Sequence, residues 1–139
     1  MTLAAQFEVA LWLLLAALLS MVIGMDRERR QRPAGLRTHM LVGLGACLFT
    51  TLSALVLPGG DPTRIAANVV TGVGFLGAGT ILQRKDSVKD LTTAASIWAT
   101  AAVGMAVGMG AWFLAILTTL MIWTILAVIR RFEHKDGER

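Results

Sequence analysis

The sequence predicts an all-α membrane protein, a polytopic bundle of five transmembrane helices with the N-terminus outside and the C-terminus in the cytoplasm. Three observations lead there: few charges, long uncharged stretches, and basic residues confined to alternate joints. Of 139 residues, 55% are hydrophobic and 16% charged, whereas soluble domains average about 25% charged. The stretches 9–25, 40–60, 65–83 and 91–129 contain no charge and make up most of the chain. A soluble enzyme, a disulfide scaffold and a disordered chain are therefore excluded.

The first three stretches each supply one helix, because a membrane crossing needs roughly 20 apolar residues. The fourth has 39 residues, and as one helix it would be about twice as long as the hydrocarbon core is thick. The chain must turn within it, and Gly108-Met109-Gly110 followed by Trp112 suits a turn at the interface. The predicted helices are 5–24, 34–57, 62–82, 91–108 and 111–130. Residues 1–132 would form one domain, and 133–139 a short charged tail.

The basic residues set the expected orientation. Eleven of the 13 Lys and Arg lie in the joints 26–32 and 83–90 and in the tail. The positive-inside rule makes this side cytoplasmic. The first segment lacks a basic n-region, so we expect a retained helix and not a cleaved signal peptide. The pI near 10.2 reflects this topology and attraction to anionic lipid, so no nucleic-acid partner is expected.

The sequence also contains signals for helix starts. Pro33 can open the second helix, and Asp61-Pro62 is typical of an N-cap followed by proline at the start of the third. Asp90 is expected to cap the fourth helix in the same way.

Small residues recur at four-residue spacing in the third and fourth predicted helices. Such residues let membrane helices approach closely, so these two helices are predicted to form the tightly packed centre. A lining of exposed backbone for a channel or ligand is the alternative. The predicted packing positions are Gly72, Gly74, Gly77, Gly79, Gly104 and Gly108.

Polar side chains near the bilayer are costly and are functional candidates by default. The candidates are Asp26, Arg37, His39, Arg64, Asn68 and Asp90. Asp26 is expected to pair with Arg37 across the first joint, with Asp90 at the same level. Arg64 would reach Asp61 or the interface, and the deeper Asn68 would make a buried interhelical hydrogen bond. The alternative for the charged groups is snorkelling and topology alone.

His39 shares one face of the second helix with Gly43, Cys47 and Thr51, at four-residue spacing. A histidine on such a face usually bonds to a neighbouring helix, and a ligand role is the minor alternative. One cysteine permits no disulfide or thiolate cluster within the chain. No His pair has zinc spacing, and no Ser/His/Asp set converges. We expect no metal site, no cofactor and no enzymatic activity.

Five segments together resemble the membrane domain of the MgtC/SapB family, in order and with the family's spacing over about residues 20–110. They are Gly24-Met-Asp-Arg-Glu28, Ala34-Gly-Leu-Arg-Thr-His39, Asp61-Pro-Thr-Arg-Ile-Ala-Ala67, Thr71-Gly-Val-Gly-Phe-Leu-Gly-Ala-Gly79 and Leu91-Thr-Thr-Ala-Ala-Ser96. The sequence departs from the family in three places. Asp26 stands where Glu is usual, His39 where Asn or another polar residue is frequent, and Asp90 where Gly is common. Many members continue into a soluble C-terminal domain, whereas this sequence ends at Arg139.

The resemblance implies five transmembrane helices with the N-terminus outside, in the bacterial inner membrane. It implies a link to magnesium homeostasis and to virulence-associated survival in macrophages. Family members look like modulators of other membrane proteins, including the F-type ATP synthase and the magnesium-transporting P-type ATPase. Asp26, Arg37 and Arg64 match charged family positions, and the glycines at 72, 74, 77 and 79 match packing positions.

Two functions stay open at this point. The first is a non-enzymatic membrane regulator that acts through a partner protein. The second is an ion transporter or channel for magnesium or protons, using Asp26, Arg37, His39, Arg64 and Asn68. Five helices are few for a monomeric pore, so a homo-oligomer is expected, with a dimer favoured.

Overall fold

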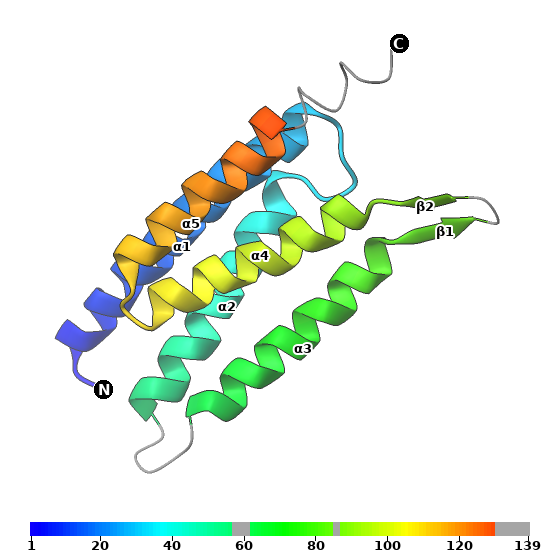
Figure 1. Ribbon diagram of the computed structural model, residues 1–139. Coiled ribbons are helices and arrows are strands. Elements are labelled where there is room, and N and C mark those ends of the chain that lie inside the picture. Colours follow the sequence, from blue (N-terminus) through cyan, green and yellow to red (C-terminus); the bar gives the residue numbers. More distant parts are fainter. Residues whose placement is uncertain (57–61, 85–86, 130–139) are drawn as a thin grey trace.

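The computed structural model describes residues 1–56, 62–84 and 87–129. Five helices and a small hairpin follow one another along the chain. They are α1 (Leu3–Arg29), α2 (Leu36–Val56), α3 (Pro62–Thr80), β1 (Leu82–Arg84), β2 (Ser87–Lys89), α4 (Leu91–Gly108) and α5 (Trp112–Thr124), which a π-helix, η1 (Ile125–Ile129), continues. Successive helices run in opposite directions, so the start of α1 and the end of η1 lie at opposite ends of the bundle (Figure 1).

Helix α4 is the centre of the bundle, because it contacts each of the other four helices. Helices α1 and α5 lie together on one side of it, and α3 forms the other edge, against α2 and α4 (Figure 1). One core cluster, which includes Ile23, Cys47 and Val103, joins α4 to α1, α2 and α5. A second, which includes Val69 and Ile97, joins α4 to α2 and α3.

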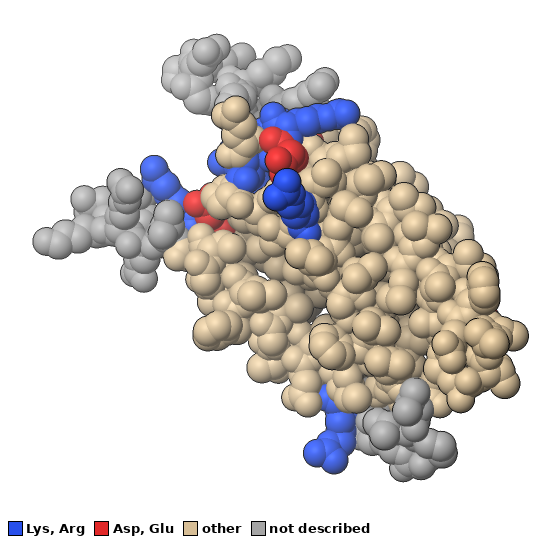
Figure 2. All heavy atoms as spheres, turned by 180° about the vertical axis from the view of Figure 1, so that it is seen from behind, with Lys and Arg blue, Asp and Glu red and all other residues tan. Residues whose placement is uncertain are grey.

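The fold is that of a multi-pass membrane protein. Three segments, Leu3–Arg29, Leu36–Leu55 and Leu91–Gly108, are long and apolar enough to cross a bilayer, and Trp112–Val128 is a shorter apolar helix. The 19 residues of α3 span about 28 Å at 1.5 Å per residue, close to the hydrocarbon thickness. Charged side chains on the face in Figure 2 gather at the two ends, with a broad uncharged band between them. The predicted five-helix class is confirmed.

The two ends differ in charge. The link between α1 and α2 and the hairpin between α3 and α4 lie at the same end (Figure 1). We call this the basic end, because the end of α1 and the α1–α2 link carry Arg29, Arg30 and Arg32. The α4–α5 turn lies at the opposite end.

The turn between α4 and α5 is where the sequence predicts it. Helix α4 ends at Gly108, and Gly110 takes a φ of +77°, a backbone region that glycine adopts without steric cost. The Ala111 N–H donates to the Ala106 carbonyl at 2.8 Å and closes the turn. Next to it, Trp112 packs edge-on against Trp12 with ring centroids 6.2 Å apart, which fastens α5 to α1.

Several predicted helix boundaries are wrong. Helix α1 continues past residue 24 to Arg29, because Arg and Glu favour helix and basic side chains are stabilised at a helix C-terminus. Pro33 does not open α2, which begins at Leu36. The Leu36 N–H there donates to Glu28 Oε2 at 2.9 Å, so a carboxylate from α1 caps α2.

The predicted third helix is too long at its C-terminal end. Helix α3 ends at Thr80 and is followed by a short antiparallel hairpin, in which Leu82 pairs with Lys89. The predicted cap at Asp61 lies outside the described residues.

Asp90 occupies the N-cap position of α4, but its side chain makes no capping hydrogen bond. Its φ of 66° is left-handed, whereas a side-chain cap needs an extended N-cap residue whose oxygen faces the first-turn N–H groups. The Asp90 carbonyl still accepts the Ala94 N–H at 3.0 Å.

Helix α4 packs more tightly on α2 than on α3, so the prediction that the third and fourth helices form the tightly packed centre is wrong. A Cβ built on Gly108 would lie 2.7 Å from the Cys47 carbonyl oxygen, and one on Gly104 would collide with the Gly43 carbonyl. On α3, only Gly77 meets a neighbour, with the Ala94 carbonyl oxygen 3.5 Å from its built Cβ. The other α3 glycines, Gly72, Gly74 and Gly79, have nothing within 4 Å.

Candidate functional site

Two features of the fold concern function: a buried polar cluster at the basic end, and an uncovered edge formed by α3. The polar cluster consists of Arg27, His39, Thr93 and Ser96, each at most 4% exposed. It lies where α1, α2 and α4 meet, so it joins three helices within the core of the bundle.

Arg27 connects α1 to α4. It is 3% exposed, and its Nη2 donates to Thr93 Oγ1 at 2.7 Å. Such a short bond is typical of a charged donor, and hydrogen bonds to charged groups contribute about twice as much as neutral ones. A buried guanidinium is costly unless it is hydrogen-bonded, so this contact fixes the position of α4 relative to α1.

His39 connects α2 to α4, as its position on a small-residue face predicts. Its Nε2 lies 3.1 Å from Ser96 Oγ, and its Nδ1 lies 2.9 Å from the Gly35 carbonyl oxygen. A carbonyl only accepts, so Nδ1 carries a proton in this contact. The Ser96 hydroxyl donates to the Thr93 carbonyl at 2.8 Å, and the direction of its contact with Nε2 depends on the tautomer of the ring. The predicted face is confirmed, since Gly43, Cys47 and Thr51 are buried with His39.

Arg27 and Thr93 were not predicted as site residues, because the arginine was counted only as a topology signal. The sequence does contain the information. Ala16, Ser20, Ile23 and Arg27 follow the 4-3-4 spacing of one helix face, and all four are buried. An arginine that continues such a face points into the bundle.

The predicted ion pair between Asp26 and Arg37 is not the one that forms. Asp26 Oδ1 accepts from Arg30 Nε at 2.8 Å, within the same helix. Residues four apart on a helix are neighbours, so this pair needs no contact across the link. Arg37 is exposed in the first turn of α2, and Asp90 is partly buried at the start of α4.

At the opposite end, Arg64 and Asn68 both lie exposed on α3. The expectation of a buried interhelical hydrogen bond for Asn68 is wrong, because its amide faces outward and no such bond forms among the described residues. The suggested contact between Arg64 and Asp61 involves a residue outside the described part of the chain.

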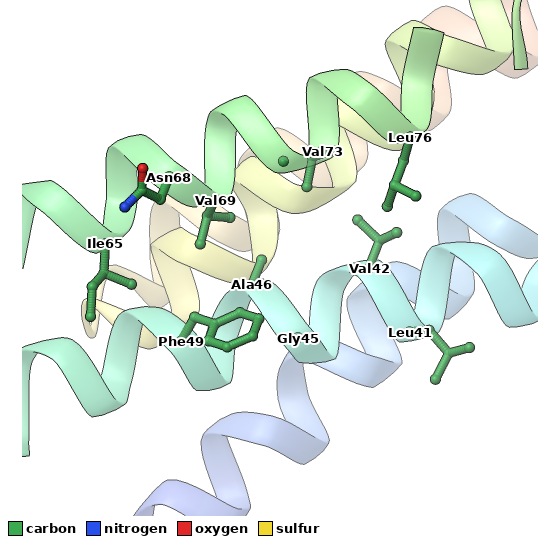
Figure 3. A pocket seen from close by; sticks show the side chains of 11 residues that line it. Leu41, Val42, Gly45, Ala46, Phe49, Ile65, Asn68, Val69, Val73 and Leu76 are labelled. Carbon is green, nitrogen blue, oxygen red and sulfur yellow. The ribbon is translucent and has the colours of Figure 1, made fainter. Parts of the chain in front are cut away.

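A groove of about 590 Å³ runs between α2 and α3 beside Asn68. Figure 3 shows Phe49 and Ala46 of α2 facing Ile65, Val69 and Val73 of α3 across it. Its walls are almost wholly apolar. Gly45 and Gly72 leave the backbone of both helices accessible along it, since nothing lies within 4 Å of a Cβ built on either.

Another face of α3, turned away from this groove, carries small side chains. Ala67, Thr71, Gly74 and Ala78 share one face at helical spacing, and all four are exposed. The Thr71 hydroxyl bonds back to the Ala67 carbonyl at 3.0 Å, so it projects little. We call this face, together with Asn68 and the groove, the α3 edge.

The described residues contain no group of three His, Cys, Asp or Glu side chains that could hold a metal ion.

Comparison with known proteins places the chain in a family. The sequence model of the MgtC family matches residues 13–135. The chain is 47% identical over 136 residues to "Putative magnesium transporter YhiD" of Escherichia coli K12, an alignment that covers 92% of this chain and 63% of that protein. It is 45% identical over 115 residues to "Protein MgtC" of Brucella abortus, covering 83% of this chain and 48% of that protein.

An uncharacterised protein of Haemophilus influenzae is 38% identical over 140 residues, with 91% of this chain and 59% of that protein covered. The chain thus spans about half to two thirds of the length of these relatives. No solved structure matches it. The match over residues 13–135 shows that this multi-pass membrane protein belongs to the MgtC family.

Proposed function

We propose that the protein is a non-enzymatic regulator in the bacterial inner membrane, linked to magnesium homeostasis, which acts by binding another membrane protein. The partner would be an ion-translocating ATPase, of the F-type ATP synthase or P-type ATPase class. Family membership supports the link to magnesium. The α3 edge is the observation that supports action through a partner.

The α3 edge has the two features that stabilise contacts between helices in lipid. Lipid tails are as apolar as Leu, so helices associate through close backbone packing and interhelical hydrogen bonds. The α3 edge offers both, because Gly74 and Ala78 allow close approach and Asn68 presents an amide. An amide that faces hydrocarbon without a partner is costly. A partner helix with a hydrogen-bonding side chain at the level of Asn68 would remove that cost.

The orientation belongs to the same proposal. With the basic end in the cytoplasm, the positive-inside rule is obeyed, and Asn68 lies nearer the outer face. A partner would then meet Asn68 in the outer half of the bilayer and Gly74 and Ala78 in the inner half. Labelling of single cysteines introduced at Arg37 and Arg64, with a membrane-impermeant reagent on intact cells, tests this orientation. Only the Arg64 position should react.

The decisive experiment is photocrosslinking in living cells. A photoreactive amino acid replaces Gly74 on α3 or, as a matched control, the exposed Leu117 on α5. Products are probed for the membrane subunits of the ATP synthase and of the magnesium P-type ATPase. We expect a product with one of them from position 74 and none from position 117. Equal yields from both positions would refute a specific edge. A product containing only two copies of this chain would support the homodimer instead.

An oligomeric transporter for magnesium or protons is the second candidate, and the printed name of the E. coli relative favours it. Polar side chains such as Thr51 and Thr100 lie buried beside α4. However, Gly104 packs directly on Gly43, so a path would have to run between subunits. Flux of both ions into liposomes decides the matter. Flux that an Arg37→Gln/Asn68→Ala variant abolishes would make transport the primary function.

A further inference from the structure

A second cavity lies at the basic end, between α1 and the end of α5. It has a volume of about 520 Å³ and combines apolar walls with a charged rim. Val22, Met25, Ala127 and Val128 form the apolar part. The last two belong to the π-helix η1, and such wider turns frequently occur at functional sites.

The rim consists of Asp26, Arg29 and Arg30 on α1 and Trp123 on α5. The Asp26 side chain is only 9% exposed, and it binds Arg30 through Nε. The two Nη groups of Arg30 make no hydrogen bond to a described residue, and its side chain is 33% exposed. Asp26 therefore orients the guanidinium, and no described residue binds its outer, fork-shaped edge.

The charges of this rim sum to a single positive charge, since Asp26 offsets one of the two arginines. A guanidinium binds the oxygens of a phosphate in a bidentate manner. Trp123 is suited to the level of lipid headgroups, where indole rings concentrate. Below it, the apolar walls face the hydrocarbon. A ligand for this cavity needs one phosphodiester charge and an attached acyl chain.

We propose that this cavity binds one anionic phospholipid of the phosphatidylglycerol type. The phosphate lies on Arg29 and Arg30, and an acyl chain runs along Val22 and Ala127. A zwitterionic lipid would bring its ammonium group to a rim with a net positive charge, and a free phosphate would leave the apolar walls uncovered. Basic pockets between membrane helices bind anionic headgroups for this reason. The bound lipid would tie η1 to the end of α1.

Native mass spectrometry of the delipidated protein tests the site. The protein is titrated in mild detergent with phosphatidylglycerol, phosphatidylethanolamine or inorganic phosphate. We expect one phosphatidylglycerol to bind at least about tenfold more tightly than phosphatidylethanolamine, and inorganic phosphate not to compete. Arg30→Gln should weaken binding about tenfold, the size expected for losing a charged hydrogen bond. Arg32→Gln removes the same charge from the link outside the cavity and should have little effect.

Asp26→Asn separates a built site from simple charge attraction. The change makes the rim more positive, so attraction alone predicts tighter binding of an anionic lipid. If Asp26 positions Arg30, binding should instead weaken by several-fold. Arg30→Lys keeps the charge without the Nε contact and the fork, and should weaken binding as Arg30→Gln does. Thermal unfolding is first used to check that each variant is folded. If Arg30→Gln or Asp26→Asn does not fold, Arg30→Lys provides the test in its place.

Three results would overturn the proposal. One is equal affinity for the two lipids. Another is an Arg32→Gln effect as large as that of Arg30→Gln. The third is tighter binding by Asp26→Asn, which would mean that phosphatidylglycerol is attracted to a diffuse basic surface.

Discussion

The glycines of α4 and most of those of α3 have opposite surroundings. Gly104 and Gly108 lie against the backbone of α2, where an added Cβ would overlap Gly43 or come within 2.7 Å of the Cys47 carbonyl oxygen. Gly72 and Gly74 face open space. The α4 glycines are therefore needed for the fold itself. Gly72 and Gly74 of α3 leave a surface that no described part of the chain covers.

The two outer edges of the bundle differ in the size of the side chains that they expose. The edge formed by α1 and α5 exposes large side chains such as Leu14, Phe113 and Leu117, as lipid requires. The α3 edge exposes many small residues, with Phe75 at 82% and Leu76 at 53% exposed as large exceptions. A face of small residues gains little from lipid tails and much from a closely packed helix. In the proposed function, α1 and α5 would therefore face lipid and α3 would face a protein partner.

The largest expected effect is that of Gly104→Leu. Its side chain would enter the space of the Gly43 carbonyl, where backbone cannot yield without separating α2 from α4. Overpacking typically costs about 1–3 kcal/mol and more where backbone is displaced. We expect little folded protein. SDS titration in mild detergent, followed by the fluorescence of the 4 tryptophans, measures it. A fully stable variant would refute the close α2–α4 contact.

The next effect is that of Thr93→Val, which removes the hydroxyl that accepts from Arg27 and keeps the shape of the side chain. Hydrogen bonds to charged groups contribute about 1.5–3 kcal/mol, so the free energy of unfolding should fall by about 2 kcal/mol in the same assay. Thr92→Val is the matched control, because Thr92 is exposed one position earlier. A similar loss in both variants would show that the Arg27 contact contributes nothing specific.

These two sites mark what could be predicted from the sequence. The five helices, the α4–α5 turn and the buried face of His39, Gly43, Cys47 and Thr51 follow from hydropathy, glycine and helical spacing. Which helix packs against each face does not follow from these patterns. The small residues around Gly104 on α4 indicate that another helix approaches closely. Both α2 and α3 carry small residues that would permit this approach. Only the lateral order of the helices decides between them.

The partners of the polar side chains are also not determined by the sequence pattern. Asp26 has possible partners in both directions along the chain, and the nearer Arg30 binds it. Glu28 caps a helix other than its own, which no local pattern indicates. Asn68 was expected to be buried because of its depth, yet depth in the bilayer and burial in protein are different quantities. Its exposure is the reason that we propose the α3 edge as the surface for a partner.

A smaller effect is expected for Ser96→Ala, which removes the neutral hydrogen bond between α4 and His39. A net contribution of about 1 kcal/mol is usual for such a bond. Thr100→Val provides the comparison, because the Thr100 hydroxyl donates to the Ser96 carbonyl of its own helix at 2.8 Å. Its loss should lower the free energy of unfolding by less than about 0.5 kcal/mol. Equal losses would mean that the His39 contact does not tie α2 to α4.

The smallest effect on stability should come from Gly74→Leu, the counterpart of Gly104→Leu on the other helix. With open space around Gly74, the added side chain meets no atom of the bundle, and surface substitutions usually change stability by about 0.5 kcal/mol or less. Binding of a partner helix should be lost, because the leucine prevents close approach of the two helices. We expect this variant to unfold as the unmodified protein does. In the crosslinking experiment the photoreactive amino acid is moved to Ala78, because position 74 is now leucine, and the crosslinked product should be lost.

Leu117→Ala on α5 should preserve both unfolding and crosslinking. If Gly74→Leu instead unfolds the protein as Gly104→Leu does, α3 packs within the bundle more closely than its exposed glycines indicate. If it is stable and still crosslinks, the partner does not use this edge. Only a stable protein without the crosslink would assign one set of glycines to the fold and the other to an interaction.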